Sequence, residues 1–191
     1  AAGFPISQAS SAEHLGVRTQ LTAQRNAVGL KETWKRFRLR VKRIATLSRT
    51  NRAASKLFNA SVPQGLYGAA TIGCSPEQLA GLNSSGAEAA GNYGLMPCPV
   101  TSCALAYHAI PACKQIVKVF AWWMKWWSAI QLEPDVLKHA IASWRNLRDD
   151  LSPLKSKDRW SRVRGPTAAV IAQLLDWGWI PALPNHWAKG R

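Results

Sequence analysis

Acidic residues are scarce in this chain. Its 191 residues include 10 aspartates and glutamates against 25 lysines and arginines, which gives a formal net charge of +15 and a pI near 10.4. A surface with this excess of positive charge attracts polyanions, most often nucleic acid and less often an anionic membrane. A merely solvated surface is the alternative, and so large a charge on so short a chain argues against it.

Uninterrupted apolar runs of membrane-spanning length are also lacking. The nearest candidate, IVKVFAWWMKWW, is broken by Lys118 and Lys125, so we expect no stable membrane insertion. The N-terminus, AAGFPISQ, has no charged leader before an apolar stretch, and the four cysteines therefore do not indicate a secreted disulfide scaffold. We expect an intracellular location, in the nucleus or the cytoplasm. Both ends look cut, and we expect the chain to be a fragment.

Lysine and arginine are absent between Leu57 and Cys113, which leaves a neutral middle between two basic zones. With 47% hydrophobic residues, the chain is expected to be globular. Apolar residues at helical spacing and prolines at helix starts predict an all-α fold, an irregular bundle of about five helices. The mixed stretch AEHLGVRTQL favours a short strand or β-hairpin over a helix at the N-terminus. We expect three regions, 1–29, 30–95 and 96–191, of which the second is basic and the third is rich in tryptophan.

The first basic zone predicts a long amphipathic helix over LKETWKRFRLRVKRIATLSR. Its apolar stripe is expected to lie in the core and consists of Leu30, Trp34, Phe37, Val41 and Ile44. Its cationic face consists of Lys31, Lys35, Arg36, Arg38, Arg40, Lys42 and Arg43. Such a face can neutralise several phosphates, with steeply salt-dependent and sequence-tolerant binding. The cationic face is therefore the first candidate binding site.

A tryptophan-rich helix is predicted to start at Pro111. The side expected to lie in the core consists of Ile116, Phe120, Trp123, Trp127 and Ile130. Another side carries Lys118, Trp122 and Lys125, and Trp122 could stack there on an unpaired base. Packing of Trp122 against a neighbouring helix is the favoured alternative for a tryptophan in such a cluster.

Shorter patterns predict the remaining elements. RAASKLFNA is expected to form a helix that ends near Pro63, because the residue before a proline disfavours helical geometry. Ser75 and Gln78 predict a capping box at the start of the next helix, and GNYGLMPCP is expected to be a loop. Pro134 and Pro166 are expected to start two later helices, with a loop or short turns over SPLKSKDRWSRVRG between them.

Three cysteines and one histidine stand at even spacing: Cys98, Cys103, His108 and Cys113. Zinc knuckles of retroviral nucleocapsids use Cys-x2-Cys-x4-His-x4-Cys, and both the tight first pair and the glycines between ligands are missing here. We expect no metal site and no cofactor, with the thiols buried as compact hydrophobes and His108 on a loop or a helix surface. Catalysis by Cys113 with His108 is a further hypothesis, which no orienting acid or oxyanion loop supports.

Several phrases, in order, resemble the region that follows the catalytic palm of non-LTR (LINE-type) retrotransposon reverse transcriptases. In that family a short strand precedes a basic helix with a repeated arginine, here LGV and WKRFRLRVKRIATL. A helix, a proline and a Tyr-Gly pair follow, here Pro63, Tyr67 and Gly68 in KLFNASVPQGLYGAATIGCSPEQLAGL. The C-terminal part resembles a tail in reverse-transcriptase-like polyproteins of some protist retroelements, through Trp160, Val163, Gly165, Pro166, Gly178, Trp179, Pro184 and Trp187. The chain departs from the family at His14, where an aromatic residue is usual.

The resemblance implies a thumb-like role for residues 30–95, which would hold RNA or an RNA–DNA duplex by its backbone. Residues 1–29 would be a remnant of the palm edge, and the missing palm domain would be a partner. The parent family polymerises DNA on RNA with clustered aspartates that hold two metal ions. The adjacent pair in this chain, Asp149 and Asp150, stands at an expected helix end with no third carboxylate nearby in sequence. We therefore expect a non-catalytic fragment.

Two alternatives to a nucleic-acid-binding role stay open. The WWMKWW segment is basic and aromatic, as membrane-surface helices often are. The chain would then be a membrane-surface module. A decayed genomic copy with no function is the other alternative.

Overall fold

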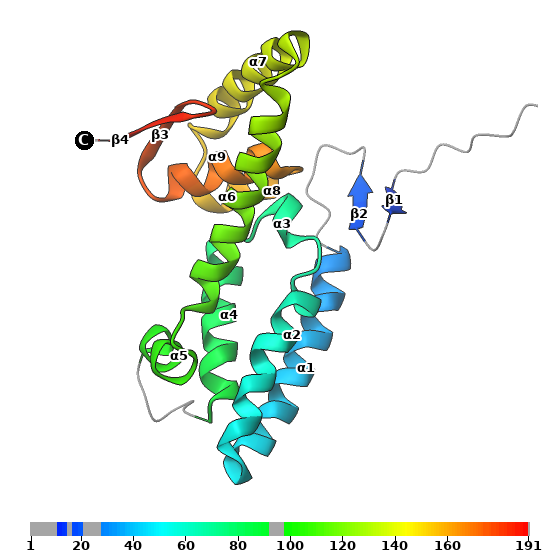
Figure 1. Cartoon of the computed structure of the whole chain (residues 1–191), viewed down its shortest axis with the longest axis vertical. Coiled ribbons are helices and arrows are strands. Elements are labelled where there is room, and N and C mark those ends of the chain that lie inside the picture. Colours follow the sequence, from blue (N-terminus) through cyan, green and yellow to red (C-terminus); the bar gives the residue numbers. More distant parts are fainter. Residues whose placement is uncertain (1–10, 15–16, 21–27, 92–97, 191) are drawn as a thin grey trace, which may run out of the picture.

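Helices make up most of the structure. The computed structural model describes residues 11–14, 17–20, 28–91 and 98–190 (Figure 1). The elements, in order, are β1 (Ser11–His14), β2 (Val17–Gln20), α1 (Val28–Thr50), the 3₁₀ helix η1 (Arg52–Lys56), α2 (Leu57–Gly65), α3 (Ala69–Ile72), α4 (Pro76–Ala89), α5 (Pro99–Tyr107), α6 (Pro111–Ile130), α7 (Pro134–Leu151), α8 (Ser156–Ser161), α9 (Pro166–Asp176), β3 (Trp179–Leu183) and β4 (His186–Lys189).

The prediction of a mainly helical fold is confirmed, and two of its details were wrong. The structure divides the chain into more helices than the bundle of about five that the periodicity predicted. We predicted β structure at the N-terminus alone, whereas β3 and β4 form an antiparallel hairpin near the C-terminus. At the other end of the chain, β1 pairs with β2. Most of the loop predicted over GNYGLMPCP lies outside the described residues.

Two clusters of buried side chains hold the helices together. The first, here called the N-terminal core, joins α1, α2, α4 and α5 around residues such as Phe37, Phe58 and Leu82. The second, the C-terminal core, joins α6, α7, α8 and α9 around residues such as Trp123 and Trp144. Helix α6 takes part in both, because its first turns pack on the N-terminal core and its later turns build the C-terminal core. Figure 1 shows α6 as the long helix that links the two groups.

Helix starts follow the sequence signals closely. The predicted capping box is confirmed: the Gln78 backbone N–H donates to Ser75 Oγ at 3.3 Å, and the Ser75 N–H donates to Gln78 Oε1 at 2.9 Å. Prolines occupy the first turn of α5, α6, α7 and α9, where the missing N–H costs no intrahelical hydrogen bond. Helix α2 runs slightly further than predicted, with Pro63 inside its last turns and Gly65 at its end.

Long-range hydrogen bonds attach the β3–β4 hairpin to the helices. The Trp144 indole N–H donates to the Pro181 carbonyl oxygen at 2.9 Å, and Arg148 Nη1 donates to the Ala182 carbonyl at 3.2 Å. Trp123 Nε1 reaches the Pro184 carbonyl at 3.5 Å. These donors come from α6 and α7, so the hairpin packs against the helices of the C-terminal core.

Candidate nucleic-acid interface

The apolar side of α1 fixes the orientation of this helix. Phe37, Val41 and Ile44 are buried as predicted and Trp34 is partly buried, while the side chain of Leu30 lies outside the described residues. Helix α1 packs against α2 and α4. A Cβ built on Gly65 of α2 would lie 2.5 Å from the Phe37 ring, so the two helices approach as closely as a glycine allows. The core side of α1 therefore cannot rotate toward solvent without breaking this contact.

The predicted cationic face lies on the solvent side of α1. All of its members are exposed: Lys31, Lys35, Arg36, Arg38, Arg40, Lys42 and Arg43. Among the described residues, no ion pair engages any of these cations, and the single acidic residue of α1 is Glu32. Arg40 differs from the rest because its Nη1 donates to Gln64 Oε1 on α2. The others point their charge at solvent.

The cationic face extends beyond the residues that we selected from the sequence. Arg49 follows Lys42 by seven residues and therefore lies on the same side of α1. Arg52 and Lys56 continue the positive charge on η1, and all three are exposed. For Arg49, helical spacing was the signal that could have identified it.

The tryptophan-rich helix presents a second, smaller patch. Lys118, Trp122 and Lys125 are exposed on α6, and Trp122 exposes 52% of its surface. The favoured expectation that Trp122 packs against a neighbouring helix was therefore wrong. Trp126, one turn further along, is also exposed, and its ring centroid lies 5.0 Å from that of buried Trp123. We had named Trp126 together with Trp122 for the membrane-surface alternative and had left it out of the nucleic-acid contacts, although its spacing of four residues from Trp122 places both on one side.

The core side of α6 largely matches its prediction. Trp123, Trp127 and Ile130 are buried, and Ile116 and Phe120 are partly buried. Helix α4 packs against α1 and also against α6. The predicted nucleic-acid contacts therefore form two patches on two helices that share a neighbour. They do not form one continuous row.

The cysteine row does not gather into a site. Cys103 is buried as predicted, but Cys98 and Cys113 are exposed, so the expectation of buried thiols was wrong for these two. Cys98 is the N-cap residue of α5 and Cys113 lies in the first turn of α6, and these end positions leave both open to solvent. His108 caps the end of α5 with a positive φ of 51° and is exposed. No cluster of three or more potential metal ligands occurs within the described ranges.

Two thiols have shifted pKa values for opposite reasons. Burial raises the pKa of Cys103 to about 11, and its thiol lies 3.2 Å from the Asn83 carbonyl oxygen. At Cys98, hydrogen bonds from the Thr101 hydroxyl and from the backbone N–H groups of Thr101 and Val100 lower the pKa. Neither thiol has a catalytic histidine placed against it by these contacts.

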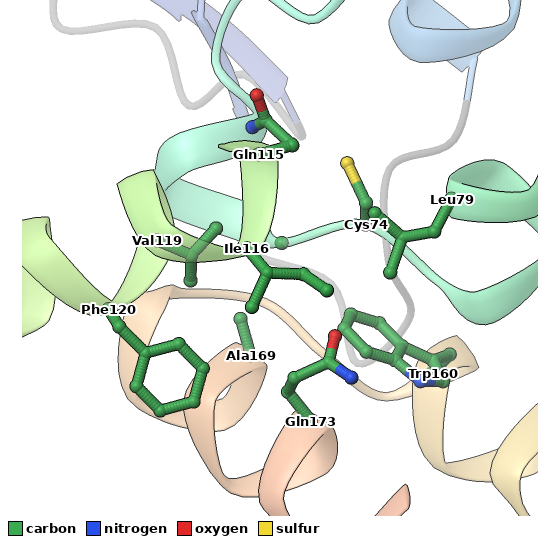
Figure 2. Close-up of a pocket in the computed structure, with 10 residues that line it drawn as sticks. Cys74, Leu79, Gln115, Ile116, Val119, Phe120, Trp160, Ala169 and Gln173 are labelled. Atoms are coloured by element: carbon green, nitrogen blue, oxygen red, sulfur yellow. The ribbon is translucent and has the colours of Figure 1, made fainter. Parts of the chain in front are cut away.

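A small cavity lies where the two cores meet. Its volume is about 10 Å³, which is room for roughly one water molecule and too little for a metabolite. Figure 2 shows Ile116 and Val119 of α6 on one side of it, with Trp160 and Gln173 on another. Its walls combine apolar side chains, such as Ile116 and Val119, with the buried amides of Gln115 and Gln173. This cavity is a packing junction between the cores.

Residues that carry the family resemblance have mixed environments. Trp160, Val163 and Pro184 are buried, whereas Trp179 is exposed. Gly178 has a positive φ of 74° in the turn that leads from α9 into β3. Asp149 and Asp150 are both exposed in the last turn of α7, where Asp149 pairs with Arg148 at 2.7 Å.

Comparisons with known proteins found no match to this chain, whether among protein-family models, curated proteins or solved structures. The resemblance to reverse transcriptases therefore stays a prediction from the residues. Within the part of the chain that the structure describes, no helix is both long enough and apolar enough to cross a membrane.

Proposed function

We propose that this chain is a non-catalytic, nucleic-acid-binding fragment of a retroelement reverse transcriptase, which grips the backbone of a template–primer duplex with α1. The observation that carries the proposal is the exposed cationic face of α1, which no ion pair among the described residues engages, on a helix whose other side is buried. Contacts from lysine and arginine to phosphates position a duplex without reading its sequence. That mode suits a protein that must hold any template.

The size of the cationic face fits a duplex backbone. From Lys31 to Arg43 the helix rises about 18 Å, at about 1.5 Å per residue. A duplex carries about one phosphate charge per 1.7 Å of its axis, so about ten phosphates lie within that length. The number of phosphates within that length is therefore enough to supply a partner for each cation that faces the duplex. Arg40 contributes least, because it already donates to Gln64.

A membrane-surface role is the second candidate, and the exposure of Trp122 and Trp126 beside Lys118 and Lys125 favours it. An interfacial helix buries its main apolar face in the lipid. The main apolar face of α6 is instead buried in the C-terminal core. We therefore favour the nucleic acid as the ligand of this chain.

Charge removal on α1 tests the proposal. The α1 variant replaces four exposed cations by glutamine: Arg36→Gln, Arg38→Gln, Lys42→Gln and Arg43→Gln. The surface control removes the same charge elsewhere, from exposed residues on α6, α7 and β4: Lys114→Gln, Lys138→Gln, Arg145→Gln and Lys189→Gln. The measurement is the affinity for a fluorescent RNA–DNA hybrid at several salt concentrations, with anionic vesicles in parallel.

We expect the wild-type affinity to fall linearly in log salt. We expect the α1 variant to lose about 2 to 4 units of slope, because each lost phosphate contact removes about 0.9. The surface control should keep the wild-type slope. Failure of the wild-type chain to bind the hybrid at low salt, or an equal loss of slope in both variants, would overturn the proposal. Binding to vesicles alone would favour the membrane-surface role.

A further inference from the structure

Arg159 is a buried arginine that organises the polar segment between α7 and α9. Its Nη1 pairs with Asp176 Oδ1 at 2.7 Å, its Nη2 donates to the Leu154 carbonyl at 2.8 Å, and its Nε donates to the Leu151 carbonyl at 3.2 Å. The neighbouring Trp160 donates its indole N–H to Asp176 Oδ2 at 2.6 Å. These bonds tie α8 to the end of α7 and to the end of α9 (Figure 1). The guanidinium group of Arg159 is thus bonded within the protein and is not available to a ligand.

The other cations of this segment face solvent. We call them the basic turn, and they are Lys155, Lys157, Arg162 and Arg164. All of them are exposed, and among the described residues no ion pair engages them. The only acidic residue among them is exposed Asp158. Lys157 and Asp158 lie on α8, Lys155 precedes this helix, and Arg162 and Arg164 follow it, so the four cations and one carboxylate come from ten consecutive residues.

The surroundings of the basic turn indicate the kind of partner. Within the segment itself, residues 152 to 165, all described, no large hydrophobic side chain is exposed, although exposed Trp177 directly follows Asp176. The centre of a protein–protein interface is usually rich in aromatic and apolar groups, and membrane-surface segments present aromatic or aliphatic groups to the lipid. A cationic, polar segment suits phosphate groups instead, because phosphate contacts need charge and hydrogen-bond donors.

We propose that the basic turn is a second contact for the phosphate backbone of the bound nucleic acid, separate from α1. The inference rests on the proposed function, since it assigns a further part of the surface to the same ligand. The buried bonds of Arg159 hold the turn in one conformation before binding, which lowers the entropy lost when phosphates are contacted. The turn belongs to the C-terminal core and α1 to the N-terminal core, so each surface can be altered without touching the packing of the other.

Two variants test the basic turn in opposite directions. The turn variant neutralises it by Lys155→Gln, Lys157→Gln, Arg162→Gln and Arg164→Gln. The second variant, Asp158→Asn, removes the only carboxylate among the residues of the basic turn and leaves every cation in place. Both are compared with wild type, the α1 variant and the surface control on a hybrid of about 24 base pairs. The salt slope and the affinity at one fixed salt concentration are measured.

We expect the turn variant to lose about 2 to 4 units of slope, at about 0.9 per phosphate contact, and the surface control to lose none. We expect Asp158→Asn to bind about 2- to 5-fold more tightly, because a repulsive charge near the phosphates is gone. Asp135→Asn removes an exposed carboxylate from α7, raises the net charge equally and should leave the affinity unchanged. Either a wild-type slope in the turn variant or unchanged binding by Asp158→Asn would overturn the inference.

The proposed function has a separate outcome in the same experiment. If wild type binds and the α1 variant loses slope while the turn variant does not, only the basic turn is refuted. If wild type does not bind the hybrid at all, both proposals fail. Equal losses of slope in the turn variant and the surface control would show a response to net charge and would also refute the basic turn.

Discussion

Two arginine–aspartate ion pairs of equal length differ sharply in burial. Both Arg159–Asp176 and Arg148–Asp149 have an N–O distance of 2.7 Å. The side chains of the first pair are 10% and 9% exposed, and those of the second are 29% and 65% exposed. We expect Asp176→Asn to lower the free energy of unfolding by about 3 to 5 kcal/mol, because breaking a buried pair leaves an uncompensated charge. We expect Asp149→Asn to cost about 0 to 1 kcal/mol.

The geometry around Asp176 explains why an amide cannot replace this carboxylate. Its two oxygens accept from Arg159 Nη1 and from Trp160 Nε1, which are both donors. An asparagine side chain offers one acceptor oxygen and one NH₂ group, so one of the two donors would face another donor. Arg148, in contrast, keeps its bond to the Ala182 carbonyl when Asp149 is changed.

Urea unfolding of wild type and both variants measures the difference, by linear extrapolation to water at constant slope m. Wild-type stability of about 5 to 15 kcal/mol leaves room to measure a loss of this size. The reasoning predicts a gap of at least about 2 kcal/mol between the two variants. Equal losses, or a loss below about 1 kcal/mol for Asp176→Asn, would refute the view that burial and the paired donors make this ion pair important.

Two further predictions concern the thiols. We expect iodoacetamide at neutral pH to label Cys98 faster than Cys113, because hydrogen bonds to its sulfur lower the pKa of Cys98; equal rates, measured by peptide mass spectrometry, would contradict this. Burial raises the pKa of Cys103 in the folded state to about 11, from the ordinary value of 9.0 that the thiol has in the unfolded chain. Between these two pH values the unfolded thiol loses its proton and the folded one keeps it, so we expect the free energy of unfolding to fall as the pH rises from 9.0 to about 11. The urea midpoint followed with pH checks the second prediction, and Cys103→Ala should flatten the curve; an unchanged curve would show that another group is responsible.

Sequence patterns predicted the elements whose signals are local. The apolar stripe of α1 and the capping box of α4 involve residues three or four positions apart, so periodicity and capping chemistry are enough to predict them. The exposed cations of α1 follow from the same periodicity, since a helix that buries Phe37 and Val41 must turn the lysines and arginines outward. This is why the first candidate site could be predicted.

Elements that depend on distant partners could not be predicted in this way. Helix α8 lies in a polar segment that looks like a loop, and its position depends on Asp176, which is 17 residues beyond Arg159. The β3–β4 hairpin contains Pro181 and Pro184, which weaken a strand pattern. Its carbonyl groups are instead satisfied by indole donors 37 and 61 residues earlier in the chain. No local pattern contains that information.

The positive surface itself follows from composition and carries little information about sites. With 25 basic and 10 acidic residues, 15 cations are left without an acidic partner when each carboxylate pairs with one cation, wherever the chain folds. A net charge of this size gives some affinity for any polyanion. To propose that α1 and the basic turn bind nucleic acid is therefore to propose that the positions of their cations matter, beyond the total charge. A measured affinity of the whole chain cannot support that proposal by itself. Only variants that remove equal charge from different places, such as the α1 variant and the surface control, separate a binding site from a general attraction.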